Sequence, residues 1–424
     1  MKACRGVFVP ETREKGTLRF TIVHYAEPIP SDPGFAPTRY TYLSARLTSM
    51  GHEVTRVAPT FFHRRRLQRD ACEFHDETFG SFLVLPTPGY QKARSLARLR
   101  FLTAFRKSVS EAICHLQPDL VLAGLPQPGI ASVCRNRLGP EVPIVLDVRD
   151  TWPTTQYQTA TLLQRVLLAP IAPLIRTATR GDLQAATNVV ALSPSYLSWA
   201  RRHSPMSQFP NGKVVPLGAP IDDESVSAMS PNPSERRGAV FVGTLSRVFD
   251  FPRLIRAWAL LESDQPDLTF RHPLTIVGSG SEMAAIRAQV APLKHVRVIG
   301  QVEHTRALSL MSRSAVGLAP YARGDFHTMP NKFFEYLSAG LPLVSSLGGD
   351  AGDLINDQGA GFSDPNATPG WVARRLFAIL SDSSLRESMS QNAIQLAKRF
   401  SRQRLTEELA DDLVKLAEGP RGAS

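Results

Sequence analysis

The feature that most restricts the fold of this chain is the repeated alternation of short apolar runs with longer, helix-like segments. The apolar runs lie at residues 20–23, 52–58, 120–123, 144–148 and 188–192 in the first half, and at 239–242, 274–277, 296–299, 316–318 and 343–344 in the second. Stretches long enough for helices, such as residues 38–50, separate them. This alternation predicts an α/β fold, in which parallel sheets are covered by crossover helices.

The length of the chain predicts more than one domain, since 424 residues exceed what one ordinary hydrophobic core holds. A polar, proline-containing segment at residues 218–238 is interpreted as a linker. We predict an N-terminal domain over residues 1–222, a C-terminal domain over 223–396 and a closing segment over 397–424, helical from 396 to 417, that packs back towards the N-terminal domain. Two facing, doubly wound, Rossmann-like domains would bind ligands at the carboxyl ends of their strands.

Composition narrows the class of protein. With 43% hydrophobic and 21% charged residues, the sequence is typical of a globular protein. No apolar run is long enough to span a bilayer, and the first twenty residues lack the apolar segment of a signal peptide. The four cysteines, at positions 4, 72, 114 and 134, lie far apart without a CxxC spacing, which argues against zinc and disulfides and favours the cytoplasm.

The net charge of +11 is concentrated in one half of the chain. Residues 1–222 contain 27 Lys and Arg against 16 Asp and Glu, whereas residues 223–424 contain 22 of each. The first half therefore carries the whole excess of positive charge. This asymmetry predicts an anionic partner for the first half, either a membrane surface, a nucleic acid or a phosphorylated substrate.

Residues 329–346, MPNKFFEYLSAGLPLVSS, place a carboxylate close to a predicted helix start. Asn331 is the predicted N-cap, and Gly340 ends the helix before a buried strand. Here Glu335 can accept hydrogen bonds from two neighbouring hydroxyls, such as those of a ribose, while the helix-start amides favour an anion such as pyrophosphate. From the residues alone, a surface glutamate that completes an amphipathic helix is the more ordinary explanation.

Two other loops that follow predicted strands carry candidate binding residues. Gly243 would let a phosphate approach the backbone and Arg247 would supply a guanidinium, although a tight turn with a solvated arginine explains this loop equally well. Arg149 and Asp150 follow the strand at 144–148, where they would either hold a substrate hydroxyl or phosphate or form a surface ion pair. The GSG sequence at residues 278–280 lacks a third glycine and is interpreted as structural.

The order and spacing of these segments resemble the retaining, nucleotide-sugar-dependent glycosyltransferases of the GT-B fold, family 4. Among the segments that carry the resemblance are PGFAPTRYTYLSARLTSMGHEVTRVAP, PIVLDVRDTWP, VFVGTLSRVFD and MPNKFFEYLSAGLPLVSS. The RDTWP and NKFFEY versions are most similar to members that assemble bacterial surface polysaccharides, which commonly use lipid-linked acceptors. The resemblance implies transfer of a sugar from a nucleotide-sugar donor to a lipid-linked or saccharide acceptor, with retention and without a cofactor or metal.

The resemblance also assigns roles to individual residues. Glu335 matches the second glutamate of the family's paired motif, which holds the donor ribose, and the first glutamate falls at His327. The phosphate-binding arginine and lysine of the family fall at Thr244 and Phe249, which leaves Arg247 and Lys332 as nearby substitutes. The implied site comprises Arg149 and Asp150 as catalytic residues, and Gly34, Gly243, Arg247, His327, Asn331, Lys332 and Glu335 as donor-binding residues, with no metal ligand.

A basic stretch in the first half predicts attachment to a membrane. Residues 91–107 are expected to form a helix that carries Leu96, Leu99, Leu102 and Phe105, and residues 64–107 hold ten basic and four acidic residues. Such a helix can lie in the interface of an anionic bilayer, or alternatively pack on the sheet with a solvated basic face. The residues expected to face the acceptor or the membrane are Arg39, Arg94, Arg98 and Arg100. We therefore expect a cytoplasmic protein, peripheral at the inner face of the membrane.

Two other classes of protein remain open at the level of sequence. Nucleotide-sugar epimerases share the architecture of two nucleotide-binding domains, but they would not need a basic first domain. A nucleic-acid-binding protein would explain the arginines at positions 64–66, 69, 94, 98 and 100, yet no recognised nucleic-acid motif accompanies them, so no nucleic-acid partner is expected.

Overall fold

The computed structural model describes residues 16–63, 65–92, 95–152, 154, 169–204, 209, 211–221, 235–324 and 328–419. The chain forms two compact units, one made of residues 1–215 with 406–424 and the other of residues 216–405. Most of the expected linker, residues 222–234, lies outside the described residues.

The first unit is built on an eight-stranded sheet with the order β10-β9-β8-β7-β1-β2-β6-β5. Its strands are parallel except β5, which pairs antiparallel with β6. They are β1 (Arg19–Val23), β2 (Glu53–Pro59), β5 (Cys72–Asp76), β6 (Gly80–Leu85), β7 (Leu120–Leu125), β8 (Ile144–Val148), β9 (Asn188–Ala191) and β10 (Lys213–Val214), with β3 (Phe61–Phe62) and β4 (Leu67–Gln68) as a separate antiparallel pair. The chain adds strands outward from β1 on one side of the sheet and outward from β7 on the other, so the winding reverses between β1 and β7. The loops that follow these two strands therefore lie next to each other.

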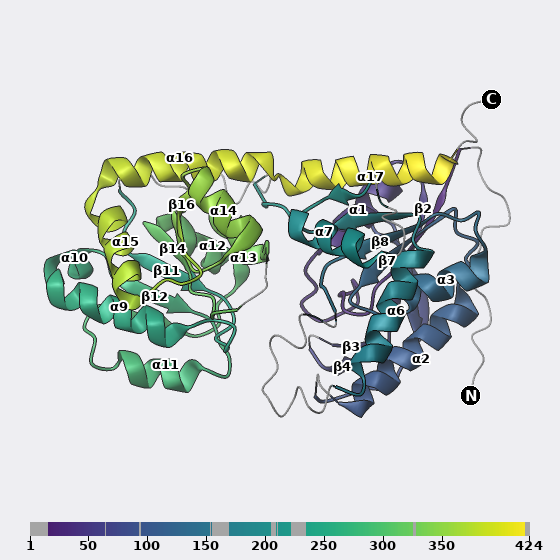
Figure 1. The fold of residues 1–424 in the computed structure, drawn as a ribbon, viewed down its shortest axis with the longest axis horizontal. Helices are drawn as coiled ribbons and strands as arrows, with labels where there is room; N and C mark the ends of the chain where they lie inside the picture. The colour runs from purple at the N-terminus through teal and green to yellow at the C-terminus, as the bar shows by residue number, and fades with distance from the viewer. Residues whose placement is uncertain are drawn as a thin grey trace. The chain divides into compact units, whose positions relative to one another are not determined.

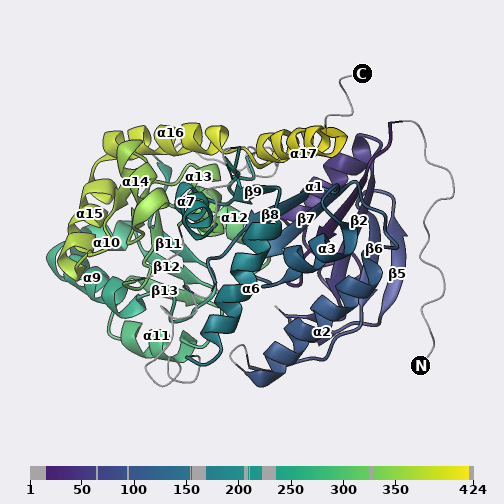
Figure 2. The same cartoon turned by 45° about the vertical axis from the view of Figure 1, so that its right-hand side comes forward.

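Helices cover both faces of this sheet. The helices are α1 (Arg39–Ser49), α2 (Leu96–Ala112), α3 (Ile130–Leu138), α6 (Ala172–Ala185) and α7 (Pro194–His203). Figures 1 and 2 show α2, α3 and α6 side by side on one face, with α1 on the other. The central strands β7 and β8 are consequently buried along their whole length.

The second unit contains a fully parallel six-stranded sheet with the order β13-β12-β11-β14-β15-β16. Its strands are β11 (Ala239–Val242), β12 (Leu274–Val277), β13 (Val296–Ile299), β14 (Val316–Ala319), β15 (Leu343–Ser345) and β16 (Gly361–Ser363). Its helices are α9 (Phe251–Asp264), α10 (Pro266–Arg271), α11 (Met283–Val290), α12 (His304–Arg313), α13 (Asn331–Ser338), α14 (Gly349–Asp357), α15 (Pro369–Ser381) and α16 (Ser383–Arg399). The winding reverses between β11 and β14, which is the arrangement expected of a dinucleotide-binding fold.

Residues of β11 point alternately into two hydrophobic cores, one on each face of the second sheet. Phe241 packs with Trp258 of α9 in one core, and Val240 packs with Tyr336 of α13 in the other. The predicted α/β class is therefore confirmed in both units, and each strand predicted from the sequence is present. The sequence reasoning missed the antiparallel edge formed by β5 and β6.

Two predicted helices differ from the structure. The helix expected over residues 396–417 is interrupted, because α16 ends at Arg399 and α17 (Arg402–Glu418) begins only after Phe400 leaves helical geometry. The Ser401 hydroxyl then accepts a hydrogen bond from the Arg404 amide at 3.2 Å, which caps the new helix. The helix expected from residue 91 starts at Leu96, since Ser95 caps α2. Among the described helices, none is long and apolar enough to cross a membrane.

Candidate functional site

The carboxyl ends of β11 and β14 form the switch point of the second unit, and Gly243 directly follows β11. Gly243 has a φ of +151°, and a Cβ at this position would collide with the ammonium group of Lys332. Gly278 packs so closely against the Gly243 carbonyl that it also admits no side chain, which supports a structural role for residues 278–280. The ammonium of Lys332 therefore lies directly over the exposed backbone at the end of a central strand.

Lys332 is enclosed by aromatic rings. Its Nζ lies 4.4 Å from the ring centre of Phe241, 5.6 Å from that of Phe249 and 5.5 Å from that of Tyr336. Within the described part of the chain, no ion pair joins Lys332 to a carboxylate. Burial lowers the pKa of Lys332 to about 8, although Glu335 opposes this effect. Lys332 is half-buried, and a partly buried cation without a paired anion is unfavourable, so this position favours an anionic ligand.

Helix α13 holds Glu335 beside this cation. Its N-cap is Pro330, which corrects the prediction that Asn331 caps the helix; Asn331 instead donates a hydrogen bond from Nδ2 to Glu335 Oε1 at 2.7 Å. The neighbouring Tyr336 hydroxyl accepts from the Val242 amide at 3.0 Å and donates to the Leu318 carbonyl at 3.2 Å, which anchors α13 to both β11 and β14. Glu335 is half-buried, with its carboxylate oriented by Asn331.

Binding of a nucleoside diphosphate is expected to weaken as the pH rises through about 8, since Lys332 then loses its charge in the free protein. Below that pH the ammonium is already charged, and above it the ligand must draw a proton onto Lys332. We expect affinity to fall about tenfold or more once the charge is lost. Calorimetric titration in buffers of different ionisation enthalpy should detect proton uptake on binding near pH 8. The Lys332→Met variant should show no such uptake, and uptake that persists in this variant would contradict the assignment.

The remaining predicted donor-binding residues are placed differently. Arg247 has a side chain that is 90% exposed, and its Nε lies 3.3 Å from Oε1 of Glu282, as a solvated turn arginine would. His327 lies outside the described residues. The structure thus brings together Gly243, Lys332 and the start of α13, while the Arg247 guanidinium pairs with a neighbouring acid.

In the first unit, Arg149 and Asp150 are both engaged by other groups of the protein. Arg149 Nη1 donates to Glu27 Oε1 at 2.6 Å, and its guanidinium lies 5.0 Å from the ring centre of Tyr40. Asp150 accepts from the Thr151 amide at 2.7 Å and from Trp152 Nε1 at 3.0 Å. These contacts correct the expectation of a surface ion pair between the two side chains, while their expected contact with a substrate stays a prediction.

Two of the four arginines expected at an acceptor or membrane surface are buried. Arg39 pairs with Asp147 at 3.1 Å, and its side chain is only 5% exposed. Arg98 donates to the Tyr25 hydroxyl at 3.0 Å and lies 4.4 Å from the ring centre of Trp152. Their charges therefore do not face a membrane, which corrects that part of the prediction for both, while contact with an acceptor stays a prediction. Arg100 is exposed on α2, and Arg94 lies outside the described residues.

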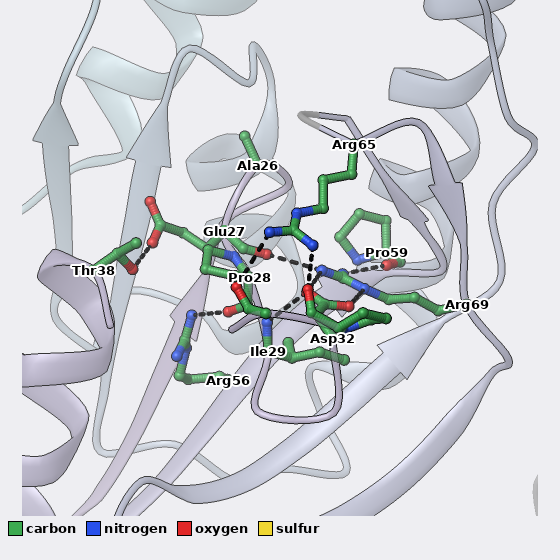
Figure 3. A network of polar contacts seen from close by, with 12 residues as sticks. Ala26, Glu27, Pro28, Ile29, Asp32, Thr38, Arg56, Pro59, Arg65 and Arg69 are labelled. Atoms are coloured by element: carbon green, nitrogen blue, oxygen red, sulfur yellow. Dashed lines mark hydrogen bonds and ion pairs between the residues drawn. The ribbon is translucent and has the colours of Figure 1, made fainter. Parts of the chain in front are cut away.

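Sequence reasoning missed the acidic partners of Arg39 and Arg149. Asp147 is a lone carboxylate within the apolar strand β8, and it also accepts from the Tyr40 hydroxyl at 2.8 Å. A charged residue inside an apolar strand is a recognisable signal for a buried ion pair. Glu27 lies in a proline-rich loop, shown in Figure 3, where the sequence carries no comparable signal.

No group of three or more His, Cys, Asp or Glu side chains that could hold a metal ion lies together among the residues the structure describes.

The sequence matches two glycosyltransferase family profiles in order along the chain. Residues 36–220 match the profile described as a glycosyl transferase 4-like domain, and residues 236–382 match the profile described as glycosyl transferases group 1. The chain is also 26% identical over 373 residues to phosphatidyl-myo-inositol mannosyltransferase of Mycolicibacterium smegmatis. The aligned segment covers 87% of this chain and 86% of that protein. A glycogen synthase of Mycobacterium tuberculosis is 28% identical over 149 residues, 34% of this chain and 33% of the relative.

Solved structures show the same fold at low identity. WaaG, described as a glycosyltransferase involved in lipopolysaccharide biosynthesis, superposes with a TM-score of 0.66 at 15% identity, covering 93% of this chain and 99% of WaaG. Sucrose-phosphate synthase from Thermosynechococcus elongatus superposes with a TM-score of 0.68 at 15% identity, covering 96% of this chain and all of that one, at 100%. With both profiles matched and the two sheets shared with these enzymes, the chain belongs to the group 1, family 4 retaining glycosyltransferases of the GT-B fold, which transfer a sugar from a nucleotide-sugar donor.

Proposed function

We propose that this glycosyltransferase transfers a sugar to a lipid-linked saccharide acceptor in the synthesis of a bacterial surface polysaccharide. The observation that carries the donor half of this proposal is the enclosed ammonium of Lys332 over the Gly243 backbone, beside Glu335. The acceptor half is supported by the basic character of the first half of the chain, and by relatives whose names refer to phosphatidyl-myo-inositol and to lipopolysaccharide.

In the donor half, Lys332 would bind the diphosphate and Glu335 would accept hydrogen bonds from the ribose hydroxyls. Gly243 would let the phosphates approach the backbone, and Asn331 would orient the Glu335 carboxylate, to which it already donates at 2.7 Å. A cation fixed at the diphosphate stabilises the negative charge that develops as the nucleotide leaves. His327 would contact the donor sugar, and Arg247 would act at the edge of the site.

The donor can be identified by screening the purified protein against a panel of UDP-, GDP- and dTDP-sugars for thermal stabilisation. A ligand that binds only the folded protein raises its apparent stability. The sugar that stabilises the protein should then release its nucleoside diphosphate, slowly with water and faster with a membrane extract that contains lipid-linked saccharides. If no nucleotide sugar stabilises the protein, the proposed donor site is wrong. If release is not accelerated by the extract, the lipid-linked acceptor is wrong.

Membrane attachment through α2 is a further part of the proposal. The helix turns Phe101, Phe105 and Val109 towards the core and leaves Leu96 69% exposed near the exposed Arg100. We expect the protein to float with anionic liposomes at low salt and to detach as salt is added.

The double variant Leu96→Asp, Arg100→Glu should weaken this flotation severalfold, because it removes both an apolar and a cationic contact with the bilayer. Arg137→Glu, on the exposed side of α3, is the matched control and should float like the wild type. If the wild-type protein does not bind anionic liposomes at low salt, membrane attachment is excluded and an acceptor in solution is favoured.

Transfer is expected to continue in excess EDTA, because Lys332 and the backbone amides near Gly243 would neutralise the diphosphate without a divalent ion. The rate of nucleoside diphosphate release should stay within about twofold of the untreated enzyme, the difference that a change of about 0.4 kcal/mol in the barrier makes. A complete loss of activity that added Mg²⁺ or Mn²⁺ restores would contradict this prediction.

A further inference from the structure

The connection between β1 and α1, residues 24–38, is an unusual loop, and we name it the Gly34 loop. It contains four prolines and no helix or strand. Loops of this length in compact domains are commonly mobile or functional. Prolines have no amide hydrogen, so the loop has few backbone donors of its own, among them the Asp32 and Phe35 amides, which donate to the Ile29 and Asp32 carbonyls at 2.9 and 3.1 Å. At its exposed apex, Gly34 adopts a φ of +60°, which few residues other than glycine tolerate.

Arginines from elsewhere in the chain supply further donors. Figure 3 shows the guanidinium groups of Arg56, Arg65 and Arg69 directed at the loop. Arg56 donates to the Pro28 carbonyl at 3.1 Å, Arg65 donates to the Gly34 carbonyl at 3.2 Å, and Arg69 Nε donates to Asp32 Oδ1 at 2.7 Å. The backbone of the Gly34 loop is therefore held in place by side chains rather than by regular secondary structure.

Glu27 connects the two ends of the Gly34 loop with each other and with the segment that follows β8. One of its oxygens accepts from Arg149, which follows β8, at 2.6 Å, and the other accepts from the hydroxyl of Thr38, the last residue of the loop. The side chains of Glu27 and Arg149 are only 3% and 14% exposed. Burial raises the pKa of Glu27, but the interactions with Arg149, His24 and Arg56 outweigh this effect. The pKa of Glu27 therefore lies well below its usual range, and the carboxylate is charged at neutral pH.

We propose that Glu27 and Arg149 act as one latch that fixes the Gly34 loop before the donor arrives, which makes Arg149 a positioning residue for transfer. This proposal rests on the proposed transfer reaction, in which the Gly34 loop is expected to take part. If the guanidinium left Glu27 to contact a sugar, it would leave a buried carboxylate without its partner, which is strongly unfavourable. A loop already fixed in its productive shape instead spares the ordering that binding would otherwise require.

A double-mutant cycle separates a positioning role from direct contact with the substrate. Glu27→Gln and Arg149→Met should each slow nucleoside diphosphate release from the stabilising donor on the order of 10²-fold, the effect expected of a displaced active-site loop. The double variant Glu27→Gln, Arg149→Met should be no slower than either single variant, because both changes break the same latch. Binding of UDP or GDP alone should be unchanged, since Lys332 and Glu335 belong to the second unit.

Hydrogen exchange provides a readout that does not depend on activity. In each ligand-free latch variant, the amides of residues 26–38 should lose their protection against hydrogen exchange. They should keep this protection in the control variant Glu53→Gln, which breaks the Arg19–Glu53 ion pair (3.0 Å) between β1 and β2. Arg149→Lys keeps the charge opposite Glu27 and should restore part of both rate and protection.

Three results would overturn the latch. The first is an Arg149→Met effect much larger than that of Glu27→Gln, with additive losses in the double variant. The second is unchanged protection of residues 26–38 in the latch variants. The third is full activity in Glu27→Gln. If the wild type itself binds no nucleotide sugar, the proposed donor site fails, while the exchange experiment still decides the latch.

Discussion

Replacing Glu335 with alanine should lower kcat/KM for the nucleotide-sugar donor by roughly 30- to 150-fold, which corresponds to about 2–3 kcal/mol of transition-state stabilisation. The reason is that a carboxylate that accepts two ribose hydroxyls makes charged hydrogen bonds, and these exceed neutral ones in strength. Glu335 is half-buried, and its side chain makes one hydrogen bond within the described part of the chain, from Asn331 at 2.7 Å, so its loss should leave the fold intact.

The matched control is Glu387→Ala, which removes an exposed glutamate from α16 in the same unit. The two variants should unfold at similar temperatures, and only Glu335→Ala should lose activity. A comparison of the nucleotide with its 2′-deoxy form sharpens the test, because the wild type should prefer the ribose and the variant should not. Unchanged donor kinetics in Glu335→Ala would return this residue to the role of a surface glutamate on an amphipathic helix.

The Lys332→Met variant should bind the nucleoside diphosphate about 10- to 150-fold more weakly, the range expected when a charged hydrogen bond is lost. Binding of the nucleoside, which has no phosphate, should be nearly unchanged. Methionine fills the space among Phe241, Phe249 and Tyr336 without a charge. Because the variant removes a half-buried cation that pairs with no carboxylate of the described residues, the melting temperature should stay the same or rise.

Arg247→Ala serves as the comparison for this second prediction. Its guanidinium is solvated and already pairs with Glu282, so its removal should weaken diphosphate binding less than the loss of Lys332 does. Equal losses of nucleoside and nucleoside diphosphate in Lys332→Met would show that this lysine does not contact the phosphates. A larger loss in Arg247→Ala than in Lys332→Met would reverse the roles that the geometry supports.

Local patterns in the sequence were sufficient to predict the architecture of both units. Apolar runs such as residues 144–148 and 239–242 alternate with helical stretches, and a parallel sheet needs that alternation to bury both faces. The helix that presents Glu335 was also predicted, because its glycine terminus and apolar flanks are features of adjacent residues. Such features involve only a few neighbouring residues and can be recognised without knowledge of the fold.

The partners of charged side chains were decided by the tertiary structure. The sequence does not distinguish Arg98 from Arg100. In the structure the guanidinium of Arg98 stacks on Trp152 and Arg100 is exposed to solvent, because the rotation of the helix on the sheet determines which of its sides is buried. Lys332 reaches Gly243 since the strand order places β11 beside β14, and Arg149 meets Glu27 since the loops after β1 and β8 run along the same sheet edge. Sequence periodicity specifies which face of an element is apolar, whereas the order of strands in space determines which charges meet.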